Sequence, residues 1–155
     1  MINLTFKQVV ADFKQTRRLA KKAENARMRS LLKVGGFIRT TARRSMKPGK
    51  GKSPPGQPPK SHQGALKNLL LFAWDNSSKS VVIGPTLLTT KRVYGPTTPA
   101  LEERGGSVTR PIKLKRGVIT TRTYKYPPRP YMGPALEIAD RKGIIPEQFR
   151  DTIRN

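Results

Sequence analysis

Few side chains in this sequence have the type and spacing that catalysis requires. The single histidine, His62, lies in a Pro/Gly-rich loop with no Asp or Glu within ten residues on either side. Glu102 and Glu103 are the only adjacent acids, and neighbours on a helix point in different directions. The sequence contains no cysteine, no metal-ligand spacing and no phosphate-binding glycine loop. We therefore predict that the protein is not an enzyme and carries no metal or other cofactor.

The chemistry that the sequence does offer is electrostatic. The 155 residues include 32 Lys and Arg against 9 Asp and Glu, which gives a net charge of +23. Residues 1–52 hold 15 of these basic residues and two acids, and residues 91–130 hold ten and two, whereas residues 131–155 are neutral. Because self-repulsion at this charge disfavours a compact isolated monomer, we expect an anionic partner.

A membrane is the least suitable of the anionic partners. The N-terminal segment is basic and amphipathic, as membrane-surface helices are, but it lacks tryptophan. The longest apolar run, Leu69 to Trp74, is too short to span a bilayer. We expect nucleic acid or an acidic protein surface, and no membrane.

The elements that must position these charges begin with a long helix. Apolar residues recur at helical spacing from Leu4 to about Met46, and Thr5 is a suitable N-cap. Gly35-Gly36 predicts a kink or a break, because glycine is unfavourable inside a helix. The segment from Lys47 to Gly64 is rich in proline, glycine and lysine and predicts an extended loop. The predicted apolar stripe of the helix comprises Phe6, Val9, Val10, Phe13, Ala20, Ala23, Leu31, Val34, Ile38 and Ala42.

The middle of the chain predicts two hairpins with a short helix between them. Apolar runs at 69–74 and 81–83 flank the polar turn 75–78. A helix follows from Thr98, with Pro99 at its first position and Gly105-Gly106 as its stop. The second hairpin has strands near 108–114 and 118–125, rich in β-branched residues.

Short helices complete the chain, one from Pro134 to about Lys142 and one that begins at Pro146. We predict an α+β fold in which the long N-terminal amphipathic helix packs on a roughly four-stranded antiparallel sheet, with short C-terminal helices. The chain forms a single domain, 1–155. Its segments are the basic helix (1–46), the Pro/Gly/Lys loop (47–64), the two hairpins with the short helix (65–126), and the Pro-rich turn with the C-terminal helices (127–155).

Five short motifs in a fixed order carry a resemblance to a known family. The sequence resembles the neck and tail-completion proteins of long-tailed bacteriophages, the head–tail joining group related to minor tail protein Z. The resemblance spans about residues 4–142; Tyr131 stands where the family has phenylalanine, and one extra residue precedes Gly105. The motifs are PPGQPP (54–59), GAL (64–66), VVIGP (81–85), ALEERGG (100–106) and RPYMGPAL (129–136).

The resemblance implies a structural role without enzyme activity. We expect a homo-oligomeric ring at the junction of head and tail that surrounds the DNA channel. Its neighbours would be connector, head-closure and tail-tube or terminator proteins of the phage, with non-specific contact to genomic DNA. The protein would be part of the virion, assembled in the host cytoplasm.

The proline-rich stretch around RPYMGP offers a rigid surface for such a ring, because proline fixes φ and lowers the entropy lost on ordering. We predict Tyr131 and Met132 as apolar anchors on a neighbouring subunit. Arg129 would form a forked contact with a neighbour's carboxylate, either Glu102 or Glu103. The alternative is an intramolecular corner that orients the next helix.

A second set of residues is expected to line the DNA channel or contact acidic partners. The alternative function is non-specific nucleic-acid binding of nucleoid or ribosomal type, because clustered Lys and Arg at a pI near 11.3 are typical of backbone binders. No zinc finger or RNA-recognition motif accompanies them. The set comprises Lys47, Lys50, Lys52, Lys60, Lys113, Lys115 and Arg116.

Overall fold

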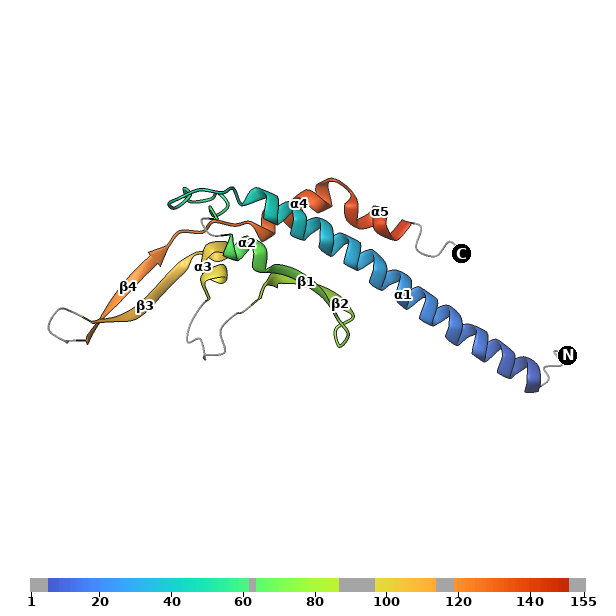
Figure 1. Cartoon of the computed structure of the whole chain (residues 1–155). Helices are drawn as coiled ribbons and strands as arrows, with labels where there is room; N and C mark the ends of the chain where they lie inside the picture. The colour runs from blue at the N-terminus through green and yellow to red at the C-terminus, as the bar shows by residue number, and fades with distance from the viewer. Residues whose placement is uncertain (1–5, 62–63, 87–96, 114–118, 151–155) are drawn as a thin grey trace.

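The computed structural model describes residues 6–61, 64–86, 97–113 and 119–150 (Figure 1). The first element is the long helix α1 (Phe6–Ser45), and the α+β class is confirmed. The remaining elements are α2 (Ala65–Leu69), β1 (Leu70–Asp75), β2 (Ser80–Pro85), α3 (Thr98–Arg104), β3 (Gly106–Lys113), β4 (Ile119–Tyr126), α4 (Met132–Arg141) and α5 (Ile144–Arg150).

The four strands form two separate hairpins, so the expectation of one four-stranded sheet is wrong. β1 pairs with β2 in antiparallel register from Leu70↔Pro85, and β3 pairs with β4 from Gly106↔Tyr126. The first hairpin packs on α1. The second hairpin is exposed on both faces along β4, from residue 119 to residue 125. Pro111 in β3 has no N–H group and cannot donate a hydrogen bond to a further strand. The second hairpin therefore has no continuous apolar face that would drive docking on the first hairpin.

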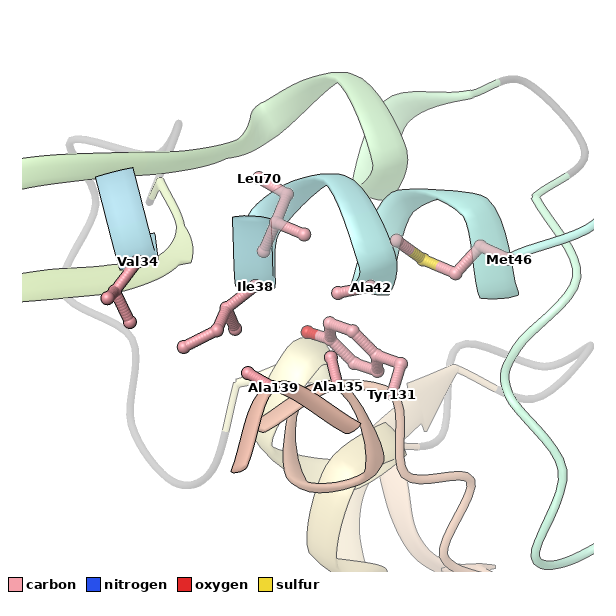
Figure 2. Packing of buried hydrophobic residues seen from close by; sticks show 8 residues of the cluster. All are labelled: Val34, Ile38, Ala42, Met46, Leu70, Tyr131, Ala135 and Ala139. Atoms are coloured by element: carbon pink, nitrogen blue, oxygen red, sulfur yellow. The ribbon is translucent and has the colours of Figure 1, made fainter. Parts of the chain in front are cut away.

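The core lies between the C-terminal half of α1, the start of β1 and helix α4 (Figure 2). On α1 the buried residues follow a spacing of four, which places them on one helix face. On α4 the buried positions are the alanines Ala135 and Ala139, whose small side chains let the two helices approach closely. The cluster comprises Val34, Ile38, Ala42, Met46, Leu70, Tyr131, Ala135 and Ala139.

The helix α1 runs without interruption through Gly35 and Gly36, so the predicted kink or break is wrong. The two glycines serve packing. A Cβ on Gly35 would lie 2.7 Å from Val81 Cγ1 and 3.2 Å from a ring carbon of Phe72. Gly35 thus lets the first hairpin lie directly on the helix, and this close approach offsets the low helix propensity of glycine.

The two ends of the molecule project from this small core (Figure 1). Every residue from 13 to 25 of α1 is exposed, including Phe13 at 64% and Leu19 at 59%. From Phe13 onward, the predicted apolar stripe is therefore buried only at the residues from Val34 on. At the opposite end the β3–β4 hairpin extends away from the core.

Helix boundaries differ from the expectation by a few residues. The short helix α2 was not predicted. Thr97 rather than Thr98 is the N-cap of α3, and Gly105 ends that helix with φ of +72°. Helix α4 begins at Met132, two residues before Pro134, because its first turn is capped by a distant side chain. Thr5 lies outside the described residues.

Candidate functional site

Arg129 lies at the centre of the proline-rich turn and is only 6% exposed. Its Nε donates a hydrogen bond to the carbonyl oxygen of Ser53 at 2.8 Å, and its Nη1 donates to Glu102 Oε2 at 3.2 Å. Its backbone N–H also donates to the carbonyl of Glu102, at 2.5 Å. The side chain of Glu102 is 19% exposed, so the ion pair is largely removed from water. Arg129 thus ties together the 47–61 loop, α3 and the turn.

Glu103 caps helix α4 from a position far away in the sequence. Its carboxylate accepts hydrogen bonds from the backbone N–H groups of Tyr131 at 2.9 Å, Met132 at 3.0 Å and Gly133 at 2.8 Å. These are donors that the first turn of a helix leaves without an intrahelical partner. A negative charge at this end also interacts favourably with the helix dipole. The cap explains why α4 starts before Pro134.

Tyr131 is buried at 1% exposure and contributes its ring to the core (Figure 2). Burial, followed by the negative charges of Glu103 and Glu102, raises the pKa of its hydroxyl to about 12. The phenol is therefore neutral at physiological pH.

These contacts overturn the predicted roles of Arg129 and Tyr131, whereas the role of Met132 stays a prediction. Arg129, expected to meet a neighbour's carboxylate, pairs with Glu102 of its own chain, and Glu103 is occupied by α4. Tyr131, expected as an anchor on a neighbouring subunit, lies inside the core, and Met132 is half-buried against it. The physical reason is that α3 and the turn are adjacent in the fold, so the opposite charges meet within one chain. The alternative, an intramolecular corner, is confirmed.

The Pro/Gly/Lys loop is fastened at both ends and near its tip. The N–H of Ser61 donates to the carbonyl of Lys47 at 3.0 Å, and Pro48 and Ser61 form an isolated parallel bridge. Near the tip, the N–H of Gly56 donates to the carbonyl of Pro128 at 2.8 Å. The loop is therefore held against the corner and presents its lysines outward.

The structure places the predicted basic residues in two distant regions. Lys47, Lys50, Lys52 and Lys60 are all exposed on the loop beside the corner. Lys113 is the last residue of β3, at the far end of the second hairpin. Lys115 and Arg116 lie outside the described residues, as does His62. The structure thus brings Lys52 and Lys60 close to Arg129, and it separates them from Lys113.

A cavity of about 90 Å³ opens where the loop meets the corner. Its lining is rich in polar and charged groups. Ser53, 5% exposed, is one of them, and its hydroxyl has no hydrogen-bond partner among the described residues. The lining residues are Gly51, Lys52, Ser53, Pro59, Lys60, Glu102 and Arg129.

The projecting part of α1 presents basic and apolar side chains together. The guanidinium of Arg17 lies 5.5 Å from the ring centroid of Phe13, within the range of a cation–π contact. Nearer the core, Lys79 of the first hairpin forms an exposed ion pair with Glu24 at 2.8 Å, and Arg27 donates to the carbonyl of Lys79. The exposed basic residues of this part are Lys14, Arg17, Arg18, Lys21 and Lys22.

The second hairpin places like charges opposite one another. Arg110 and Arg122 are register partners on β3 and β4, and both are exposed. Like charges directly across a strand pair are destabilising. The adjacent pair, Thr109 and Thr123, is joined by a hydroxyl–hydroxyl hydrogen bond of 2.8 Å, and Ile119 is 72% exposed. The hairpin therefore offers a cationic surface with apolar residues beside it.

The described residues contain neither a metal-binding cluster nor a membrane-spanning helix. No group of three or more His, Cys, Asp or Glu lies close enough together there to hold a metal ion. No helix in this part of the chain is both long and apolar enough to cross a membrane.

Comparisons with known proteins gave no match: no family model, no curated protein and no solved structure is significantly similar to this chain.

Three structural features could not be predicted from the sequence. The cap by Glu103 joins residues about thirty positions apart, and nothing in the local pattern at Met132 indicates it. The buried hydroxyl of Ser53 lies in a stretch of composition typical of solvated loops. Arg39 of α1 donates to the carbonyl of Leu70 at 2.6 Å, a contact between residues 31 positions apart that no local pattern indicates. The one feature of the corner that the sequence does indicate is the rigid turn, because prolines flank Arg129 on both sides.

Proposed function

We propose that this chain is a structural subunit of a bacteriophage neck or tail-completion ring, through which DNA passes between head and tail. The observation that carries the proposal is the pair of projecting elements, the N-terminal part of α1 and the β3–β4 hairpin, at opposite ends of a small core. The motif resemblance over residues 4–142 supplies the phage context.

Both projecting elements carry surfaces that their own chain does not cover. On α1 these are Phe13 and Leu19, and on the hairpin Ile119. Two different uncovered surfaces on one chain favour head-to-tail association, in which one surface meets the other on the next copy. If the rotation that relates one copy to the next closes after a whole number of copies, the assembly is a ring, and this is the arrangement that we propose.

The corner supplies the rigidity that a repeated contact needs. Arg129 and Glu103 fix α3, the turn and α4 in one orientation through the hydrogen bonds described above. The RPYMGP stretch thus serves the ring indirectly, because it sets the angle between core and hairpin instead of touching a neighbour.

The charge distribution requires an anionic partner for the assembled ring. The exposed basic residues of α1 and the opposed Arg110 and Arg122 would repel their equivalents on neighbouring copies. DNA phosphates or acidic neighbouring proteins relieve that repulsion. Assembly should therefore be strongly salt-dependent.

The test is the oligomeric state of the purified chain, measured by light scattering and negative-stain microscopy from low to about 1 M salt, where the screening length falls to about 3 Å. We expect rings whose yield rises with salt. Phe13→Asp with Leu19→Asp should give monomers with unchanged circular dichroism. The matched control, Gln15→Asp with Asn25→Asp, makes the same charge change at exposed polar positions of α1 and should still form rings. A chain that stays monomeric at every salt and protein concentration would contradict the proposal.

The second candidate is non-specific nucleic-acid binding as the working activity, and the observation that favours it is the exposed basic surface of α1. The two functions separate on titration with duplex DNA. A nucleic-acid binder should bind as a monomer below micromolar concentration with a steep dependence on salt. A ring subunit should bind DNA weakly as a monomer and tightly only after assembly.

A further inference from the structure

We propose that the cavity between the 47–61 loop and the Arg129 corner is a binding site for a single phosphate group. The proposal concerns the individual chain, and it holds whether or not the chain forms a ring. It is separate from the general attraction of a basic surface for anions, because the site has a defined lining and a buried floor.

The floor of the site holds two polar side chains that are more than nine-tenths buried. Arg129 donates from Nε to Ser53 and from Nη1 to Glu102, and its Nη2 donates no hydrogen bond to any described residue. The hydroxyl of Ser53 lacks a partner there as well, although buried polar groups are nearly always hydrogen-bonded. A ligand that accepts hydrogen bonds would satisfy Nη2 directly, and it would satisfy the Ser53 hydroxyl, which has less than 1 Å² of accessible surface, after a rotation of that side chain.

The rim of the site selects an anion. Lys52 and Lys60 line the cavity from the exposed side of the loop. With Arg129 they bring three positive charges to the cavity, against the single carboxylate of Glu102, which Arg129 already holds. The surplus charge excludes a cation and favours an oxyanion with more than one negative charge or several acceptor oxygens.

The size and residue types agree with phosphate. A cavity of about 90 Å³ is several times the space that one water molecule needs, so it accommodates a compact group with four oxygens. The triplet Gly51-Lys52-Ser53 supplies the residue types that end a phosphate-binding glycine loop. Here the triplet does not open a helix, so recognition would depend on the side chains.

The experiment measures binding of inorganic phosphate to the full chain by calorimetry and by thermal unfolding, against chloride at matched ionic strength. We expect saturable binding and a higher unfolding temperature in phosphate, because a ligand that binds only the folded state stabilises it. Ser53→Ala removes the buried hydroxyl with little change in volume, and it should weaken binding on the order of tenfold. Equal unfolding temperatures in phosphate and chloride would overturn the proposal.

A matched pair of double variants separates the site from general electrostatics. Lys52→Gln with Lys60→Gln should weaken phosphate binding on the order of tenfold, whereas Lys47→Gln with Lys50→Gln should leave it within about twofold. All four lysines are exposed on the same loop, and only the first pair lines the cavity. Equal losses in the two double variants would show a diffuse charge effect and refute the site.

The phosphate group could belong to the free ion or to a nucleic-acid backbone, and competition distinguishes them. A short thymidine oligonucleotide that displaces inorganic phosphate from the wild-type chain, and binds the Ser53→Ala variant more weakly, identifies a phosphodiester ligand. An oligonucleotide that leaves bound phosphate in place identifies the free ion. Failure of the ring experiment would leave this result unaffected.

Discussion

Removal of the Glu103 carboxylate should destabilise the fold by separating α3 from α4. In Glu103→Ala, three backbone N–H groups of the first turn of α4 lose their acceptor. Loss of a capping side chain costs about 1–2 kcal/mol. Loss of its charge at a helix N-terminus adds about 0.5–1 kcal/mol. We therefore expect a decrease of about 1.5–3 kcal/mol in the free energy of unfolding.

The substitution Glu103→Gln separates charge from hydrogen bonding. Glutamine keeps one acceptor oxygen and loses the charge, so it should cost about 1 kcal/mol. For a chain of this size, 1 kcal/mol shifts the unfolding temperature by about 2–4 °C. The alanine variant should therefore unfold about 3–12 °C below the wild type, and the glutamine variant about 2–4 °C below it.

The assay is urea and thermal unfolding followed by circular dichroism. Glu137→Ala is the matched control, because Glu137 is an exposed carboxylate on the same helix. An exposed substitution of this kind should change stability by no more than about 0.5 kcal/mol. If Glu103→Ala and Glu137→Ala were equally stable, the carboxylate of Glu103 would not hold the start of α4, and the argument for a rigid corner would fail.

Three further predictions concern packing, pH and the buried ion pair. Gly35→Ala should destabilise the chain by about 1–3 kcal/mol through overpacking, whereas Gly36→Ala should stabilise it by about 0.5–1 kcal/mol, and urea unfolding measures both. Hydrogen bonds from the hydroxyls of Ser77 and Ser78 lower the pKa of Asp75 to about 2, so the contribution of Asp75 to stability is present above pH 4 and is lost as the pH falls towards 2. The amide chemical shifts of the turn should report this titration, and Asp75→Asn should abolish it. Arg129→Met should cost about 3 kcal/mol because it leaves Glu102 unpaired, and adding Glu102→Leu should recover part of that loss in a double-mutant cycle.

Each of the three has an outcome that would contradict it. The packing around α1 is misassigned if the two glycine variants are equally stable, because only a Cβ at Gly35 lies under 3 Å from another side chain. An amide titration with a midpoint near 4 would mean that the turn hydroxyls do not hold Asp75. If the double variant at Arg129 and Glu102 were no more stable than the single one, the two side chains would not be coupled.

The order and type of most elements could be predicted from the sequence. The turn after Asp75 separates two apolar runs, and the structure pairs them as β1 and β2. The glycines after Arg104 end α3, because Gly105 adopts a positive φ that other residues rarely adopt. These features depend on neighbouring residues, so a local pattern is sufficient to find them.

The arrangement of those elements could not be predicted, because it depends on contacts between distant residues. The sequence gives no local signal that Gly35 faces Val81, so a packing glycine was interpreted as a helix breaker. In the same way, Arg129 next to prolines indicates a rigid turn but not its partner. The partner is Glu102 of the same chain, and the prediction of a neighbour's carboxylate was wrong. A stripe of apolar residues along α1 likewise does not reveal that Phe13 is exposed whereas Val34 is buried.

The core joins the end of α1 to α4, and this has a consequence for synthesis of the chain on the ribosome. Ala42 and Met46 are made early, whereas Tyr131 and Ala139, which cover them, emerge only after both hairpins. Contacts between such distant positions form late and slow the folding of a domain. A nascent chain that has not passed α4 therefore exposes an apolar, highly basic helix beside ribosomal RNA. The buried face of α1, from Val34 onward, thus stays uncovered until translation reaches α4.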